Sequence, residues 1–64
     1  METDPQAVLT RVRELRARYA DCHREGMAAL ERGDLKALEA AIWAEKEIID
    51  EQMDLVKELG TSRT

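Results

Sequence analysis

The strongest constraint on the fold is a pair of apolar stripes with helical spacing, one on either side of Gly33 and Asp34. Within each stripe the residues follow one another in steps of three and four, the spacing of a helix that packs against another helix. The first stripe consists of Val8, Val12, Leu15, Tyr19, Cys22, Gly26 and Ala29, and the second of Leu35, Leu38, Ile42, Glu45, Ile49, Gln52, Val56 and Leu59. Reversal of the chain between them brings Gly26 level with Ile42 without a slip in register. We therefore predict an all-α fold, an antiparallel two-helix hairpin.

Residues that favour helix ends lie where this hairpin needs them. Thr3 or Asp4 is suited to cap a first helix, with Pro5 just inside it, and Gly33 is suited to end that helix in the left-handed conformation. Asp34 then caps the second helix, which we expect Gly60 to end. The predicted single domain covers 1–64, with a helix over 5–32, a turn at 33–34, a helix over 34–59 and a frayed tail over 60–64.

The apolar arc of each helix is wider than contact with one neighbour requires. On the second helix Ala41, Ile48 and Leu55 extend the stripe sideways, and a lone hairpin buries too little surface to offset chain entropy comfortably. We expect a homodimer that forms a four-helix bundle. The residues assigned to its core and dimer contacts are Val8, Val12, Leu15, Tyr19, Leu38, Ile42, Ile48, Ile49, Leu55, Val56 and Leu59. The alternative is that an amphipathic helix of another protein occupies the open face.

Polar residues at the stripes are expected to fix the register of the hairpin. Glu45 falls level with His23, and Gln52 falls level with Leu15, so each is placed to find a partner across the interface. Gly26 is expected to make room for Ile42 or Trp43 of a neighbouring chain.

A metal site is the sharper interpretation of the same region. Cys22, His23 and Glu45 are possible ligands of zinc or iron, but the sequence lacks the Glu-x-x-His spacing of carboxylate sites in bundles. Cys22 and His23 are also adjacent, so their side chains diverge by about 100° on a helix and cannot act as a nucleophile and base. We predict no metal, no cofactor and no enzymatic activity.

Trp43 is the candidate contact for a protein partner. It lies outside the apolar arc, and tryptophans in such places are enriched at binding hot spots. The residues that share its helix face are Lys36, Glu39, Glu47 and Asp50. The alternative is a structural role, in which the ring lies over the aliphatic stems of its neighbours.

Charge is unevenly distributed between the two predicted helices. The first is basic near its start, through Arg11, Arg13, Arg16 and Arg18, whereas the second is acidic toward its end, through Glu45, Glu47, Asp50, Glu51 and Asp54. Hairpin closure brings the two segments side by side, which favours the antiparallel arrangement. The formal net charge of −4 argues against a nucleic-acid partner. RNA binding by the four arginines is nevertheless the alternative function.

The remaining composition indicates a cytoplasmic protein that does not enter a membrane. The chain has one cysteine, which excludes an internal disulfide and is typical of a reducing compartment. Residues 1–5 lack the basic and apolar regions of a signal peptide, and no apolar stretch approaches the roughly twenty residues of a membrane span.

The segment YADCHREGMAALERGDLKALEAAIWAEKEIIDEQMDLVKEL, residues 19–59, resembles the helical hairpin of bacterial flagellar export chaperones of the FliT and FlgN type. Gly33, Asp34, Leu35 and Leu38 match the turn and the spaced leucines that follow it, and Glu45 begins the charged part of the second helix. The chain is shorter than such chaperones and lacks their further helices. The resemblance implies a small helical protein that binds a secretion or regulatory partner, with a chaperone-like, adaptor or inhibitor role.

Overall fold

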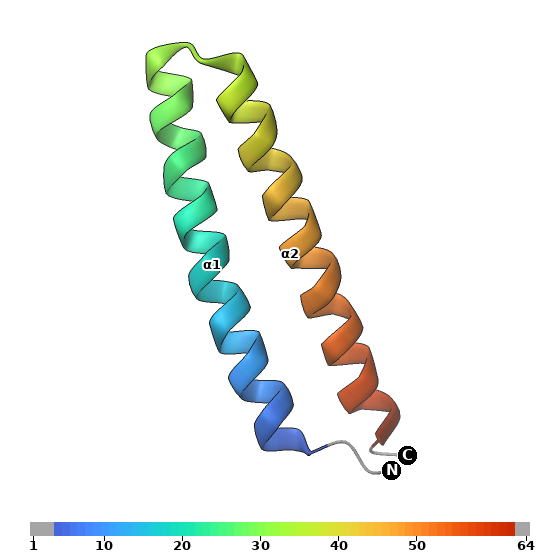
Figure 1. Ribbon diagram of the computed structural model, residues 1–64. Coiled ribbons are helices and arrows are strands. Elements are labelled where there is room, and N and C mark those ends of the chain that lie inside the picture. The colour runs from blue at the N-terminus through green and yellow to red at the C-terminus, as the bar shows by residue number, and fades with distance from the viewer. Residues whose placement is uncertain (1–3, 63–64) are drawn as a thin grey trace.

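The computed structural model describes residues 4–62, which form two helices and contain no strand. Helix α1 spans Pro5–Arg32 and helix α2 spans Leu35–Ser62. The helices lie side by side and run in opposite directions, in a rod of 47 × 15 × 14 Å (Figure 1). The prediction of an all-α chain with two helices packed against each other is therefore confirmed.

Asp4 caps the start of α1. Its carboxylate accepts a hydrogen bond of 3.0 Å from the backbone N–H of Gln6, which satisfies one of the amide hydrogens that a helix start leaves without a partner. Pro5 follows at a position where no amide hydrogen is needed. The alternative cap, Thr3, lies outside the described residues.

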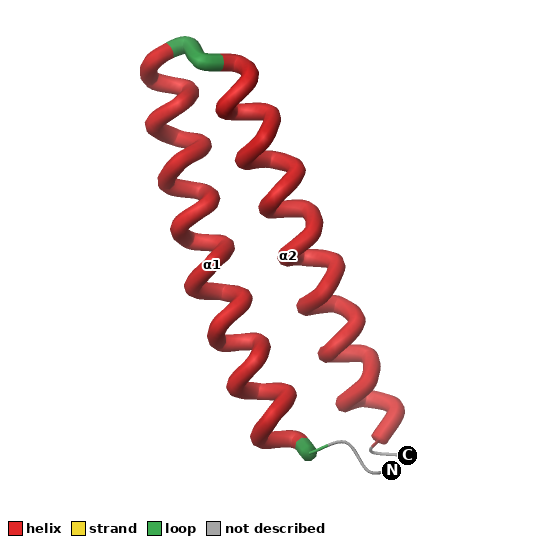
Figure 2. The backbone as a smooth tube through the Cα atoms, viewed as in Figure 1, coloured by secondary structure: helices red, strands yellow, loops and turns green. Residues whose placement is uncertain are grey.

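Gly33 and Asp34 form the whole connection between the helices (Figure 2). Gly33 has a φ of 73°, and its backbone N–H donates to the carbonyl of Leu30, at 3.1 Å. The Asp34 carboxylate accepts a hydrogen bond of 3.1 Å from the backbone N–H of Ala37. So short a connection makes the two helices antiparallel neighbours.

Helix α2 continues beyond the range predicted from the sequence. It runs to Ser62, three residues past the expected end at Leu59, and Gly60 lies within it. Gly60 does not adopt a positive φ, and a glycine in a helix costs only about 1 kcal/mol relative to alanine. Gly60 alone therefore does not end the helix. The predicted frayed tail over 60–64 is helical up to Ser62, and its last two residues lie outside the described range.

A β-carbon added at Gly33 and one added at Gly60 are expected to have opposite effects on stability. Gly33→Ala is expected to destabilise the hairpin by about 1–2 kcal/mol, because a β-carbon disfavours the left-handed conformation. Gly60→Ala is the matched control: nothing lies within 4 Å of its added β-carbon, so better helix propensity is expected to stabilise by up to about 1 kcal/mol. Thermal unfolding followed by circular dichroism measures both. Shifts of the same sign would contradict these backbone assignments.

Small residues of the two helices meet near Gly26. A β-carbon placed on Gly26 would lie 3.3 Å from the Ala41 β-carbon and 3.8 Å from Leu38 Cδ1 of the same chain. Ala29 is also fully buried. The expectation that Gly26 makes room for Ile42 or Trp43 of a neighbouring chain is therefore wrong, because Ala41 of its own chain takes that place.

Helix α2 presents a different row to α1 than the stripe predicts. Ala41 and Ile48 are buried, whereas Ile42, Ile49 and Val56 are exposed. These last three residues, which are assigned to the core and dimer contacts together, are therefore not buried against α1 within the hairpin. The physical reason is size: beside Gly26 the helix backbones are close enough for an alanine side chain and too close for an isoleucine.

The other residues assigned to the core lie at the contact between the helices or beside it. Leu15 is the largest fully buried side chain, at 1% exposure. Val8 and Ile48 are also buried, and the half-buried members of the set are Val12, Tyr19, Leu38, Leu55 and Leu59.

Candidate protein-binding surface

A row of large apolar side chains on α2 is exposed in the hairpin. Leu35, Ile42, Ile49 and Val56, which we call the exposed row, follow one another in steps of seven residues and are 72%, 54%, 44% and 56% exposed, respectively. Because seven residues make about two helical turns, the row lies along one side of α2. Contiguous apolar surface of this kind is typical of interaction sites rather than of isolated monomers.

A shallow groove of about 540 Å³ joins the exposed row to α1. From α2 it is lined by Ile49, Gln52, Met53 and Val56, and from α1 by Arg16, Tyr19 and Ala20. Met53 is itself 53% exposed. Methionine adapts its shape to a partner, so this groove is the part of the apolar surface best suited to receive side chains from another helix. Arg16, Ala20 and Met53 all lie beside the predicted stripes, but the sequence pattern does not indicate that they line one groove.

One of the predicted register contacts is present between the helices. His23 Nδ1 lies 3.2 Å from Glu45 Oε1, and the Glu45 side chain is only 16% exposed. The His23 ring also stacks on Tyr19, with ring centroids 6.1 Å apart and an interplanar angle of 8°. Gln52 is half-buried in the groove, and its side chain forms no hydrogen bond with another described residue. Glu45 therefore joins the helices at a defined level, and Gln52 does not.

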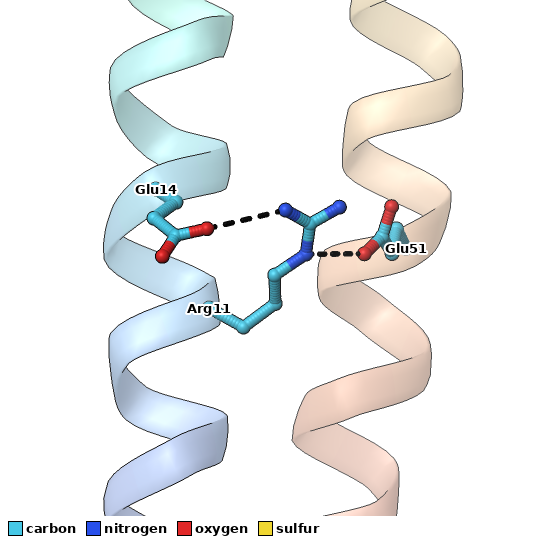
Figure 3. A network of polar contacts seen from close by, with 3 residues as sticks. All are labelled: Arg11, Glu14 and Glu51. Atoms are coloured by element: carbon cyan, nitrogen blue, oxygen red, sulfur yellow. Dashed lines mark hydrogen bonds and ion pairs between the residues drawn. The ribbon is translucent and has the colours of Figure 1, made fainter.

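An arginine of the basic cluster joins the two helices. Arg11 Nε donates to Glu51 Oε2 at 2.8 Å, and Arg11 Nη1 donates to Glu14 Oε2 at 3.2 Å (Figure 3). The expected pairing of basic α1 with acidic α2 thus takes place here. Among the residues that the structure describes, Arg13 and Arg16 form no ion pair.

The Arg11–Glu51 contact makes stability depend on pH. The hydrogen bond from Arg11 lowers the pKa of Glu51 from its ordinary value, outweighing desolvation, which raises it. Because the folded-state pKa is the lower one, the contribution is complete above the ordinary glutamate value of about 4.5 and is lost as the pH falls through the folded-state pKa.

Glu51→Gln is therefore expected to lower the Tm by a few degrees at neutral pH and to leave it unchanged at about pH 2. Glu47→Gln, on the outer side of α2, is the control and is expected to have little effect at either pH. Thermal unfolding at the two pH values measures the difference. A Glu51→Gln effect of the same size at both would contradict the role assigned to this carboxylate.

The Trp43 face lies on a different side of α2 from the exposed row. Trp43 is 59% exposed, and the residues predicted to share its face, Lys36, Glu39, Glu47 and Asp50, are all exposed. Lys46 Nζ donates to Asp50 Oδ2 at 2.9 Å, which raises the pKa of Lys46. This pair was not predicted from the sequence, although a lysine four residues before an aspartate on a helix is the signal for it.

The described residues hold neither a metal cluster nor a membrane span. No three of their His, Cys, Asp and Glu side chains come together as metal ligands, so the alternative of a site at Cys22, His23 and Glu45 finds no support. Neither helix carries an apolar stretch of the length needed to cross a bilayer, within the part of the chain that the structure describes.

Comparisons with known proteins add no relative. No family model, curated protein or solved structure matches the chain. The surface must therefore be interpreted from its own chemistry.

That chemistry is apolar contact combined with scattered charge. The exposed side chains form a row and a groove that suit a partner helix, and the ionisable groups with shifted pKa values, Arg11, Lys46 and Glu51, are each explained by an ion pair on the surface. The surface is suited to bind another protein.

Proposed function

We propose that this protein is a small non-enzymatic protein-binding module that self-associates into a four-helix bundle and presents a second surface to a partner. The observation that carries the proposal is the exposed row of Leu35, Ile42, Ile49 and Val56. In this view the row and the adjoining groove close the dimer, and Trp43 with Lys36 and Glu47 binds the other protein.

The amount of exposed surface supports a second copy. The chain has an accessible surface of 5243 Å², whereas a compact monomer of its mass, 7.3 kDa, is expected to expose roughly 4,200 Å². The excess is about 1,000 Å² per chain, so a dimer that covers it buries roughly 2,000 Å² in total. Areas of that size are typical of stable interfaces.

The partner contact belongs at Trp43 because dimer formation leaves it free. Trp43 lies one residue from Ile42, and successive residues on a helix point about 100° apart, so closing the exposed row does not cover the indole. An exposed tryptophan beside Lys36 and Glu47 combines a large contact area with charge. This is the basis for a chaperone-like or regulatory role, as an adaptor or an inhibitor.

Tryptophan fluorescence tests this division of the surface. As protein concentration rises and chains associate, the emission of Trp43 and its quenching by acrylamide are expected to stay those of an indole in water. Emission that shifts to the blue on association would place Trp43 in the dimer contact and contradict its assignment to another partner. Salt-dependent retention on RNA, lost on substitution of Arg13 and Arg16, would instead favour the alternative nucleic-acid function.

A further inference from the structure

Three of the four residues of the exposed row are arranged symmetrically about Ile49, and Leu35, the fourth, has no counterpart within the row. Ile42 and Val56 lie seven residues before and after Ile49, and both are exposed to a similar extent. When a second α2 is laid antiparallel along this row, Ile49 meets Ile49 of the second copy and Ile42 meets Val56. Residues that pair in this way in two antiparallel helices are suited to a two-fold interface, in which each copy contributes the same surface.

The side of α1 next to the groove is centred at the same height along the hairpin as Ile49. His23 contacts Glu45 across the hairpin, so Tyr19, four residues before His23, lies level with Ile49, four residues after Glu45. Ala20 is the adjacent residue of α1 that lines the groove. On the same side of α1, at steps of seven residues, lie Leu9, Arg16, His23 and Leu30. Leu9 and Leu30 are equally far along α1 from residues 19 and 20. A single two-fold axis at this level therefore places α1 antiparallel on α1 of the second copy and α2 antiparallel on α2.

Charged residues beside the exposed row also meet residues of opposite charge when two α2 helices lie antiparallel. Glu39, Lys46, Asp50 and Lys57 follow one another along α2 in steps of seven, four and seven residues, next to the row on the side away from α1. In an antiparallel pair of α2 helices, Glu39 comes level with Lys57 of the second copy and Lys46 comes level with Asp50. Opposite charges meet at each of these places, so the edge of the interface is complementary to itself.

We propose that the surface takes a second copy of this chain with its turn at the opposite end, so that α2 lies antiparallel on α2 and α1 lies antiparallel on α1. The two-fold axis passes at the level of Ile49. This arrangement rests on the self-association proposed above and adds its direction, which neither the apolar periodicity nor the buried area determines.

The other two-fold arrangement, with both turns at the same end, is less complementary. It lays α1 on α2 of the second copy, so Arg16 and His23 face the isoleucines of the exposed row. It also brings Arg13 near Lys57 and Arg24 near Lys46, and like charges at an interface are unfavourable, although Asp21 beside Arg24 and Asp50 beside Lys46 reduce the second repulsion.

The proposed arrangement has two unfavourable contacts of its own. Reversal of α1 lays the charged Arg16 on His23 of the second copy, and it brings Arg13 toward Arg24 of the second copy. Because Arg24 Nη1 already pairs with Asp21 Oδ1 at 3.2 Å, that carboxylate reduces the repulsion between the two arginines.

Site-specific disulfide formation tests the arrangement. Ile49→Cys is made in a Cys22→Ser chain, so that the new thiol is the only one. Helices packed 8–10 Å apart with this residue at the axis bring its two α-carbons to about 5 Å, within the range that a disulfide spans. Mild oxidation is expected to convert most of the chain to a covalent dimer.

Ile42→Cys in the same background is the matched control. Its two copies are separated by fourteen residues of helix, about 21 Å, so alone it is expected to form little disulfide, whereas mixed with Val56→Cys it is expected to cross-link. Circular dichroism and light scattering of the reduced proteins establish that each variant is folded and associated.

The outcomes separate this arrangement from the proposed function. A reduced protein that is dimeric but does not cross-link through Ile49→Cys overturns the arrangement alone. If a mixture of His23→Cys and Ile42→Cys cross-links instead, the turns lie at the same end. A Cys22→Ser chain that stays monomeric, like the unmodified chain, overturns both the arrangement and the self-association.

Discussion

Replacing Ile49 by aspartate is expected to convert the associated protein into single chains and to lower its helix content at micromolar concentration. Ile49 is 44% exposed in the hairpin, and the proposed dimer buries it at the centre of the exposed row. A carboxylate without a partner at such a position costs several kcal/mol. A chain released from the dimer is held only by the contact between its own two helices, and such a hairpin is only marginally stable. Sedimentation and circular dichroism of the same samples measure both effects.

Trp43→Asp is the matched control for this substitution. Trp43 is more exposed than Ile49, at 59%, and it lies on a different side of the same helix. The same charge introduced there is expected to leave association and helix content nearly unchanged. If both variants dissociate, or if neither does, the division of α2 into a dimer surface and a partner surface is wrong.

Replacing Leu15 by alanine is expected to have the largest effect on folding. Leu15 is 1% exposed and is the largest fully buried side chain among the described residues. Truncation of a leucine at such a position costs about 2–5 kcal/mol through lost burial and the cavity left behind. A domain of 64 residues has little more stability than this, so a large fraction of the variant is expected to be unfolded at room temperature.

Leu35→Ala makes the same chemical change where the side chain is 72% exposed. It is expected to cost less than about 1 kcal/mol, because Leu35 lies at the end of the exposed row and has no counterpart within the row in the proposed dimer, so little buried surface is lost. Urea unfolding followed by circular dichroism compares the two variants. Similar losses for both would show that the contact between α1 and α2 does not lie where the structure places it.

The sequence was sufficient to predict the two helices and the turn. The helical period of the apolar residues, the capping residues and the left-handed glycine each depend only on neighbouring residues in the sequence. Asp4, Gly33 and Asp34 therefore indicate the helix ends without knowledge of the rest of the fold. Which residues of the two helices lie opposite one another could also be predicted, because a two-residue connection leaves one helix little freedom to slide along the other. The contact of His23 with Glu45 joins one such pair of residues.

The rotation of α2 about its own axis could not be predicted from periodicity. Rows that begin at Ala41 and at Ile42 are both apolar and lie about 100° apart, so the sequence pattern fits either. The choice depends on side-chain volume against Gly26, where Ala41 fits at 3.3 Å. It is therefore a packing property of the two helices together.

The particular ion pair at Arg11 could not be predicted either. The sequence indicates the sign of each helix, and opposite signs do meet. Arginine has a long side chain, however, and several carboxylates of α2 lie within its reach. The structure selects Glu51, at 2.8 Å, and this choice determines which carboxylate has its pKa lowered.

The most direct test of the account is the molar mass of the unmodified chain in solution, measured by light scattering over a range of concentrations. The account predicts a mass of twice 7.3 kDa at micromolar concentration, which Ile49→Asp reduces to that of one chain. A folded, fully helical chain that keeps the mass of a single copy at all concentrations would contradict it, because the exposed row would then be stable without a second copy.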